Sequence, residues 1–315
     1  MYSCSNEIDV NATPKETMVV YGILEPDQDT HYIKVNKTYL LQGDAIAAAK
    51  DPTNTQYPDI LDVKVNAMNG NTVAQTATFT RVMGTSREAG LFPAPEQPLY
   101  RYIGNFATDN LQLNIKNIQT GTTVTSSTSL LGNLVVDRPA PLPLVEVVNW
   151  TSTYGYKVKF YSAKAGKMYQ VSIRFNYKEL VGNNTTDTAY KYIDWNLGSL
   201  LSTTTNGNEP MEVLIEGNRF YQFCQSSMEV NPNLKRFAGK LDFSIVAANE
   251  ALATYVETNA PSNTIVQERP SFTNIENGIG IFASRRIYHR TNVGMSNASI
   301  QELKTGALTS NLNFQ

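Results

Sequence analysis

The chain has 315 residues, of which 17% are charged, and its 26 Lys and Arg against 28 Asp and Glu leave a net charge of -2. This balance excludes a global electrostatic field that would attract nucleic acid, so we expect no nucleic-acid partner. No run approaches the roughly 18 apolar residues that a membrane-spanning helix needs, and the length allows two ordinary domains.

A cysteine near the start is the first residue with chemical meaning. Cys4 follows Ser3 and precedes the polar residues Ser5 and Asn6. A mature bacterial lipoprotein begins in this way, with acyl chains on the cysteine that anchor it to a membrane. Residues 5–17 lack periodicity, so we interpret residues 1–17 as a lipid-anchor tether. The other interpretation is an unmodified thiol on a disordered leader.

Apolar and polar residues then alternate in short runs, which predicts strands with one buried face. Turn residues separate these runs, and together they predict an immunoglobulin- or fibronectin-like β-sandwich over residues 18–136. The segment from Gly43 to Asp51 breaks the alternation and predicts one or two helical turns. The alternating apolar positions are Ile33 and Val35, then Leu61, Val63 and Val65, then Leu111, Leu113 and Ile115.

The segment Asp137–Pro143 carries three prolines at alternate positions. This spacing favours extended polyproline geometry, so we predict a semi-rigid linker over residues 137–143. Residues 144–315 then form a second β-rich domain with a few short helices. The whole chain is therefore predicted to be mostly β.

Stronger strand patterns and two helices mark this second domain. One helix is predicted with Asn218 as its N-cap, because apolar residues follow at helical spacing. Another begins at the capping-box pattern Ser299–Glu302 and ends at Gly306. The strands are predicted around residues 156–160, 169–177 and 241–245.

The pair Gly278 and Gly280 allows two interpretations. A dinucleotide-binding loop needs a third glycine and a following helix, whereas β-forming residues follow here. We therefore favour a turn that leads into a strand, with Gly278 at positive φ and Gly280 allowing a close backbone approach.

The strand that follows would place Arg286, Tyr288 and Arg290 on one face. An Arg-Tyr-Arg stripe can hold a carboxylate, phosphate or sugar through bidentate hydrogen bonds and stacking, so these residues are candidate binding residues. The alternative is an edge strand whose charges discourage aggregation.

The sequence offers little catalytic chemistry. His31 and His289 fall in different halves, no serine stands in a G-x-S-x-G motif, and Cys224 lies on the apolar side of its helix as a structural thiol. No cysteine or acidic spacing matches a metal site. We predict no catalytic residues, no cofactor and no metal. A pair of glycosidase carboxylates cannot be identified from spacing, since it forms only in space.

Four blocks, taken in order, carry a family resemblance. They read VVYGILEPDQDTHYIKVNKTYL, DILDVKV, YQVSIRFNYKE and TNIENGIGIFASRR. With them the chain from Cys4 onward resembles a family of Bacteroidetes outer-membrane lipoproteins of unknown function, often encoded near TonB-dependent receptors. The resemblance implies a β-rich protein that is lipid-anchored through Cys4 on the periplasmic face or cell surface, and it implies no catalytic residues. The chain departs from the family in lacking a full signal peptide, and we expect a trimmed start.

Three functions follow as hypotheses. The first is a non-enzymatic envelope protein that binds a TonB-dependent receptor or other envelope protein, a glycan or a peptide. Exposed rings would then line a shared surface, with Trp150 and Trp195 as candidates beside Tyr154 and Tyr156. The second is a structural adhesin or assembly component with a broad apolar patch. The third is a glycan hydrolase.

Overall fold

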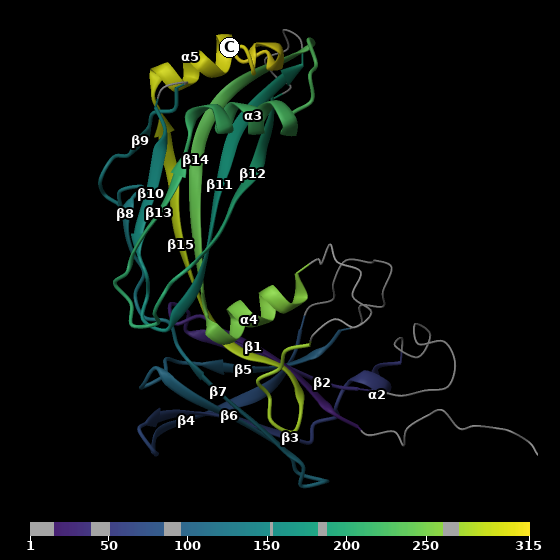
Figure 1. Ribbon diagram of the computed structural model, residues 1–315. Helices are drawn as coiled ribbons and strands as arrows, with labels where there is room; N and C mark the ends of the chain where they lie inside the picture. The colour runs from purple at the N-terminus through teal and green to yellow at the C-terminus, as the bar shows by residue number, and fades with distance from the viewer. Residues whose placement is uncertain (1–15, 39–50, 85–95, 152–153, 182–187, 261–270) are drawn as a thin grey trace, which may run out of the picture. The chain divides into compact units, whose positions relative to one another are not determined.

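The structure is a computed structural model that describes residues 16–38, 51–84, 96–151, 154–181, 188–260 and 271–315. The fold is mostly β with a few short helices, as the sequence predicts. The chain divides into two compact units, shown in Figure 1. Unit 1 comprises residues 1–130 and 254–284, and unit 2 comprises residues 131–253 and 285–315.

Unit 1 is built from short strands joined by tight turns. The turn residues Met68–Asn71 follow the alternating run that ends at Val65, and they lie where one strand ends at Asn69 and the next begins at Thr72. The elements are β1 (Met18–Leu24), β2 (Thr30–Lys37), α2 (Pro52–Thr55), β3 (Leu61–Asn69), β4 (Thr72–Met83), β5 (Pro98–Ile103), β6 (Asn110–Asn117) and β7 (Thr123–Ser129), with the first part of β15 (Ile279–Met295).

The strands of unit 1 form two layers that share β4. One layer has the order β15-β1-β2-β5-β4 and the other has the order β4-β3-β6-β7. β4 joins both because residues Thr72–Phe79 pair with β3 and residues Thr80–Met83 pair with β5. Apolar residues of both layers, such as Val20, Ile33 and Leu113, belong to one buried cluster. This arrangement is consistent with the sandwich that the alternation predicts.

The first part of β15 lies parallel to β1, and its glycine is required by that packing. Gly280 has φ +117°, and a Cβ there would stand 1.9 Å from the Val20 carbonyl oxygen. The predicted close approach at Gly280 is therefore correct. The predicted positive φ at Gly278 is wrong, since Asn277 takes the left-handed conformation instead, with φ 59°.

Unit 2 contains long strands in two sheets. Its larger sheet has the order β12-β11-β14-β15, with β9 beside β15, and its smaller sheet has the order β13-β10-β8. The elements are β8 (Val135–Arg138), β9 (Val147–Val148), β10 (Tyr156–Tyr161), β11 (Gly166–Val181), β12 (Thr188–Leu201), β13 (Pro210–Ile215), α3 (Gly217–Ser227), β14 (Leu234–Asn249), α5 (Asn297–Thr305) and the 3-10 turn η1 (Ser310–Leu312). Helix α4 (Glu250–Asn259) crosses the boundary between the units.

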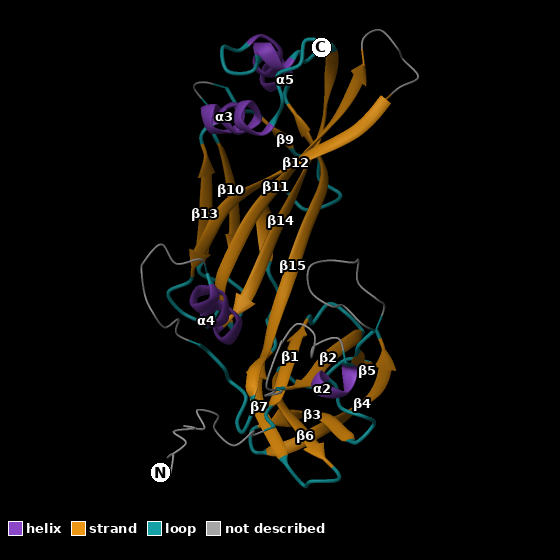
Figure 2. Cartoon of the chain, turned by 90° about the vertical axis from the view of Figure 1, so that its right-hand side faces the viewer, coloured by secondary structure: helices purple, strands orange, loops and turns teal. Residues whose placement is uncertain are grey.

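An aromatic core lies between the two sheets of unit 2. Inward residues such as Val158, Phe175 and Phe243 are buried in it. Helices α3 and α5 lie at one end of the strands, as Figures 1 and 2 show. Both predicted helices are present, and the predicted end of α5 at Gly306 is confirmed, but their N-caps are not those predicted. The N-cap of α5 is Ser296, and the N-cap of α3 is Glu216, which makes no side-chain capping bond.

The division into units differs from the predicted domains in two ways. Unit 1 ends at Leu130 and regains residues 254–284, so neither unit is a continuous segment. The predicted linker 137–143 belongs to unit 2, where the loop is fixed by the buried Arg290. Most of the predicted tether 1–17, with Cys4, and of the helix predicted at 43–51 lies outside the described residues.

Candidate functional site

The two tryptophans predicted at a binding surface do not form one. Trp150 is fully buried, and its ring stacks on Phe220 with centroids 4.3 Å apart. Trp195 points inward from β12 and stacks on Phe223 of α3 at 5.1 Å. The prediction for Trp150 is therefore wrong, and Trp195 packs against the core. Of the neighbouring tyrosines, Tyr156 is buried and Tyr154 is exposed.

Tyr288 and Arg290 of the arginine stripe on β15 face the interior of unit 2. Tyr288 packs against the core, and Arg286 donates from Nη1 to the Asn133 side-chain oxygen at 2.6 Å. Arg290 is only 6% exposed, and its guanidinium donates to the carbonyl oxygens of Ala140, Leu144 and Thr291 at 2.8, 2.8 and 2.7 Å. The prediction that Arg290 grips a ligand is wrong, because its donors are used to hold a loop.

The opposite face of the same sheet is polar and aromatic. Alternation along β11, β12, β14 and β15 turns the apolar residues inward and leaves charged, amide and hydroxyl side chains on the outer face. We call this surface the polar face. Its residues are Ser172, Arg174, Asn176, Lys178, Tyr190, Tyr192, Asp194, Lys240, Asp242, Ser244, His289 and Thr291.

Two exposed tyrosine rings stand beside cations at one side of the polar face. The guanidinium of Arg174 lies 3.8 Å from the ring centre of Tyr192, and the Lys178 ammonium lies 5.1 Å from that of Tyr190. Tyr190 is 76% exposed and Tyr192 is 55% exposed. The contacts with the cations favour defined ring positions while much of each ring remains open to a ligand.

The charges of the polar face are organised by hydrogen bonds. Arg174 donates from Nε and Nη2 to the two carboxylate oxygens of Asp194 at 2.7 and 2.8 Å, which is a bidentate pair. Asp242 accepts from the Asn176 amide at 2.8 Å and from the Asn292 backbone N–H at 2.9 Å. Both carboxylates therefore have fixed positions.

Two hollows of the polar face share Asp242. One has a volume of about 460 Å³ and includes Arg174 and His289, and the other, of about 390 Å³, includes Tyr190 and Tyr192. Because the Asp242 carboxylate lines both hollows, they lie next to each other on the polar face. Their combined lining offers aromatic rings together with hydrogen-bond donors and acceptors, which suits an elongated polar ligand.

The carboxyl chemistry of this face differs from that of a glycosidase acid. Hydrogen bonding to Arg174 lowers the pKa of Asp194, whereas a general acid needs a raised pKa. Cys224 is fully buried, and burial raises the pKa of its thiol, so it is held as a neutral thiol rather than a nucleophile. In the described part of the chain no group of three metal-ligating side chains occurs, and no helix there is suited to cross a membrane.

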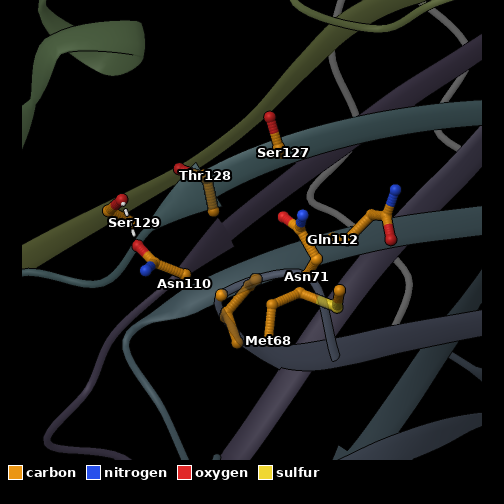
Figure 3. Close-up of a pocket in the computed structure, with 9 residues that line it drawn as sticks. Met68, Asn71, Asn110, Gln112, Ser127, Thr128 and Ser129 are labelled. Carbon is orange, nitrogen blue, oxygen red and sulfur yellow. Dashed lines mark hydrogen bonds between the residues drawn. The ribbon is translucent and has the colours of Figure 1, made fainter. Parts of the chain in front are cut away.

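A third hollow lies in unit 1, shown in Figure 3. It has a volume of about 710 Å³ and lies between the β3–β4 turn and strands β6 and β7. The side chains of Asn71, Gln112 and Ser127 border it, and Ser129 donates to Asn110 at 3.0 Å. Its lining has no charged or aromatic residue, so it provides less specific recognition than the polar face.

The sequence contains a signal for strand β12, one of the strands that build the polar face. Tyr190, Tyr192 and Asp194 alternate with Lys191 and Ile193, which is the pattern of a strand. The sequence also predicts a strand around residues 169–177, which corresponds to β11. The outward residues of β11 form a binding surface only together with those of β12, and the sequence does not show that these two strands are neighbours.

The comparisons with known proteins are distant. No family model and no curated protein matches the chain. The C-terminal globular domain of an oligosaccharyltransferase from Pyrococcus abyssi is 10% identical, with a TM-score of 0.22, over 70% of this chain and 44% of that domain, so the chain spans less than half of its length. A multidomain segment of titin is 9% identical, with a TM-score of 0.18, over 90% of this chain and 99% of that segment.

Proposed function

We propose that this chain is a non-catalytic binding protein of the bacterial cell envelope, and that the polar face of unit 2 binds a glycan. The observation that carries the proposal is the pair of exposed rings of Tyr190 and Tyr192 beside two polar hollows that share Asp242. Aromatic rings pack against the apolar faces of sugars, while fixed carboxylates, amides and cations bond the hydroxyl groups.

Binding of soluble oligosaccharides tests this proposal. The full chain is titrated calorimetrically with short oligomers of glucose, mannose, xylose and galacturonate. We expect the double variant Tyr190→Ala/Tyr192→Ala to lose about tenfold in affinity, since two stacking contacts are removed. Tyr32→Ala is the matched control, because Tyr32 is an exposed tyrosine of unit 1. Equal affinity of the double variant, or no binding of any oligomer, would contradict the proposal.

A hydrolase is the competing function at the same face. It would release reducing ends from the bound oligomer and would stop when Asp194→Asn and Asp242→Asn are introduced. The lowered pKa of Asp194 and the bonds that occupy both carboxylates favour binding over hydrolysis. Measurable release of reducing ends that these two variants abolish would replace the binding proposal.

The proposed location rests on Cys4 and on the family resemblance. A lipid on this cysteine would hold the protein at the outer membrane, where a TonB-dependent receptor is the expected neighbour. Expression with an alkyne-tagged fatty acid should label the protein and place it in the membrane fraction. The Cys4→Ser variant should be unlabelled and recovered in the soluble fraction, and membrane recovery of this variant would refute the anchor.

A second candidate function is an assembly component, which a specific apolar loop of unit 2 favours. Leu142, Leu144 and Val145 are 72%, 60% and 88% exposed, and Arg290 fixes the backbone that presents them. Rigidly presented apolar side chains suit a protein partner. In a mild-detergent pull-down from native membranes, a receptor that is recovered with the protein but lost with Leu142→Ser/Val145→Ser would support assembly.

A further inference from the structure

Strand β12 is the end strand of the larger sheet of unit 2. Among the described residues it pairs with β11 alone, in an unbroken register from Leu180↔Thr188 to Ser172↔Asn196. In an antiparallel pair about half of the backbone N–H and C=O groups point away from the partner strand. β12 therefore presents a row of backbone groups to which another strand can bond.

The usual protection of a sheet edge is weak in this stretch. Residues 188–196 contain neither proline nor glycine, and the irregularity of the pairing comes only after Asn196. Lysine is a common blocking residue, but the Lys191 ammonium turns back to Glu179 at 3.6 Å. Long, regular edges of this kind accept an additional strand.

The charged residues of β12 indicate which kind of strand can pair with this edge. Lys191 and Asp194 point to opposite faces of the sheet, since they are three positions apart in a strand. When two copies of β12 pair antiparallel and symmetrically, directly opposite residues have their side chains on the same face of the sheet. The residue opposite Lys191 is then one from its own face, such as Lys191, Ile193 or Trp195, and never Asp194. A second copy therefore adds no opposite charge beside Lys191 or Asp194, whose present ion-pair partners are Glu179 and Arg174 of β11.

A strand from another protein can place an opposite charge beside each of them, in addition to their present partners on β11. It needs a basic residue opposite Asp194 and an acidic residue three positions later, opposite Lys191. The residues between them would lie beside Ile193 and Tyr192 and would be apolar and aromatic. We infer that β12 binds an extended antiparallel segment of a partner protein with a basic-apolar-aromatic-acidic pattern. This site goes beyond the glycan proposal and does not depend on it.

The test uses the full chain and synthetic peptides with the core Lys-Val-Tyr-Glu flanked by threonine and tyrosine. Two isomers carry backbone N-methyl groups at alternate residues, so that one isomer loses the N–H groups facing β12 and the other loses those facing solvent. We expect one isomer to bind like the parent peptide and the other at least about tenfold more weakly. The charge-reversed core Glu-Val-Tyr-Lys should weaken binding by a similar factor.

Hydrogen exchange locates the bound peptide. The parent peptide should slow exchange at amides of residues 189–196 of β12, while amides of β11, already paired on both sides, should change little. Equal binding of the two N-methyl isomers, protection outside β12, or no binding of the parent peptide would overturn the inference. Concentration-dependent dimerisation of the protein with the same β12 protection would assign the edge to a second copy instead.

Discussion

His31 is the residue whose surroundings most clearly conflict with its ability to ionise. Its ring is 3% exposed and lies 4.9 Å from Phe106 and 6.3 Å from Tyr102, centroid to centroid. Burial lowers its pKa below the ordinary 6.5, although the Gly104 backbone and the charges of Asp29 and Glu25 act in the opposite direction. The native protein therefore holds this imidazole neutral.

This environment predicts an acid-sensitive stability. The unfolded chain binds a proton at His31 near pH 6.5, whereas the native chain binds it only at lower pH. The stabilising contribution is therefore fully present above pH 6.5 and is lost as the pH falls below it toward the native pKa. Urea unfolding at a series of pH values from 7.5 to about 5 should show a falling free energy of unfolding.

The variant His31→Phe should flatten this decline, because phenylalanine fills the aromatic site without titrating. His289→Gln is the control, since His289 is the second histidine of the chain and is exposed. The decline should remain in this control. An unchanged pH dependence in His31→Phe would show that other groups cause it.

At the scale of elements, one arginine fixes a whole loop. Arg290 bonds the Ala140 and Leu144 carbonyls, and the Glu146 carboxylate accepts from the Ala140 N–H at 3.1 Å. The proline-containing segment is thereby attached to β15. Three alternate prolines suggested a spacer, but proline spacing carries no information about an arginine some 150 residues later in the chain.

Arg290→Met should therefore loosen this loop and destabilise unit 2. The substitution keeps much of the apolar side chain but removes the donors of three partly buried carbonyl groups, so we expect a loss of about 2 to 4 kcal/mol in the free energy of unfolding. Lys157→Met is the matched control, since its ion pair with Glu212 is exposed and should contribute less than about 1 kcal/mol. Equal stability of the two variants would refute the structural role of Arg290.

Local sequence patterns predicted most elements, but they placed the N-caps of α3 and α5 and the exposed face of β15 less well. The alternation in β3, β6, β10 and β11 matches their buried faces. The cap of α5 fell one helical turn earlier than predicted, because Ser296 and Ser299 can both cap and only the backbone decides. Strand β12 escaped prediction because its mixed polar composition hid its alternation. The polar face could not be predicted, since it needs the order of four strands.

For the whole molecule, the decisive contacts are between distant parts of the chain. Ile275 and Phe282 are buried in the core of unit 1, together with residues that end at Leu130. Strand β15, which pairs in parallel with β1, supplies Phe282, and Ile275 lies in the segment just before this strand. No local signal encodes a pairing across more than half of the chain, so the predicted break into two continuous domains missed it.

A fragment of residues 16–136 should consequently fold poorly. It lacks Phe282, and loss of a buried phenylalanine side chain alone costs about 3 to 5 kcal/mol. Its unfolding in urea, followed by circular dichroism, should lack a cooperative transition or show one at lower urea than Phe282→Ala in the full chain. A synthetic peptide of residues 271–290 added in excess should restore stability. A fully stable fragment would contradict this composition of unit 1.

Because residues 254–284 belong to unit 1, the core of this unit cannot be completed until the ribosome has synthesised them. About 140 residues separate Leu130 from Ile275. At synthesis rates of about 5 to 20 residues per second, the ribosome needs roughly 7 to 30 seconds to supply that missing part of the core. During this interval the early strands expose apolar surface that only the late segment covers. Chaperone demand should therefore be greatest before the last strand emerges, rather than after the first half of the chain is complete.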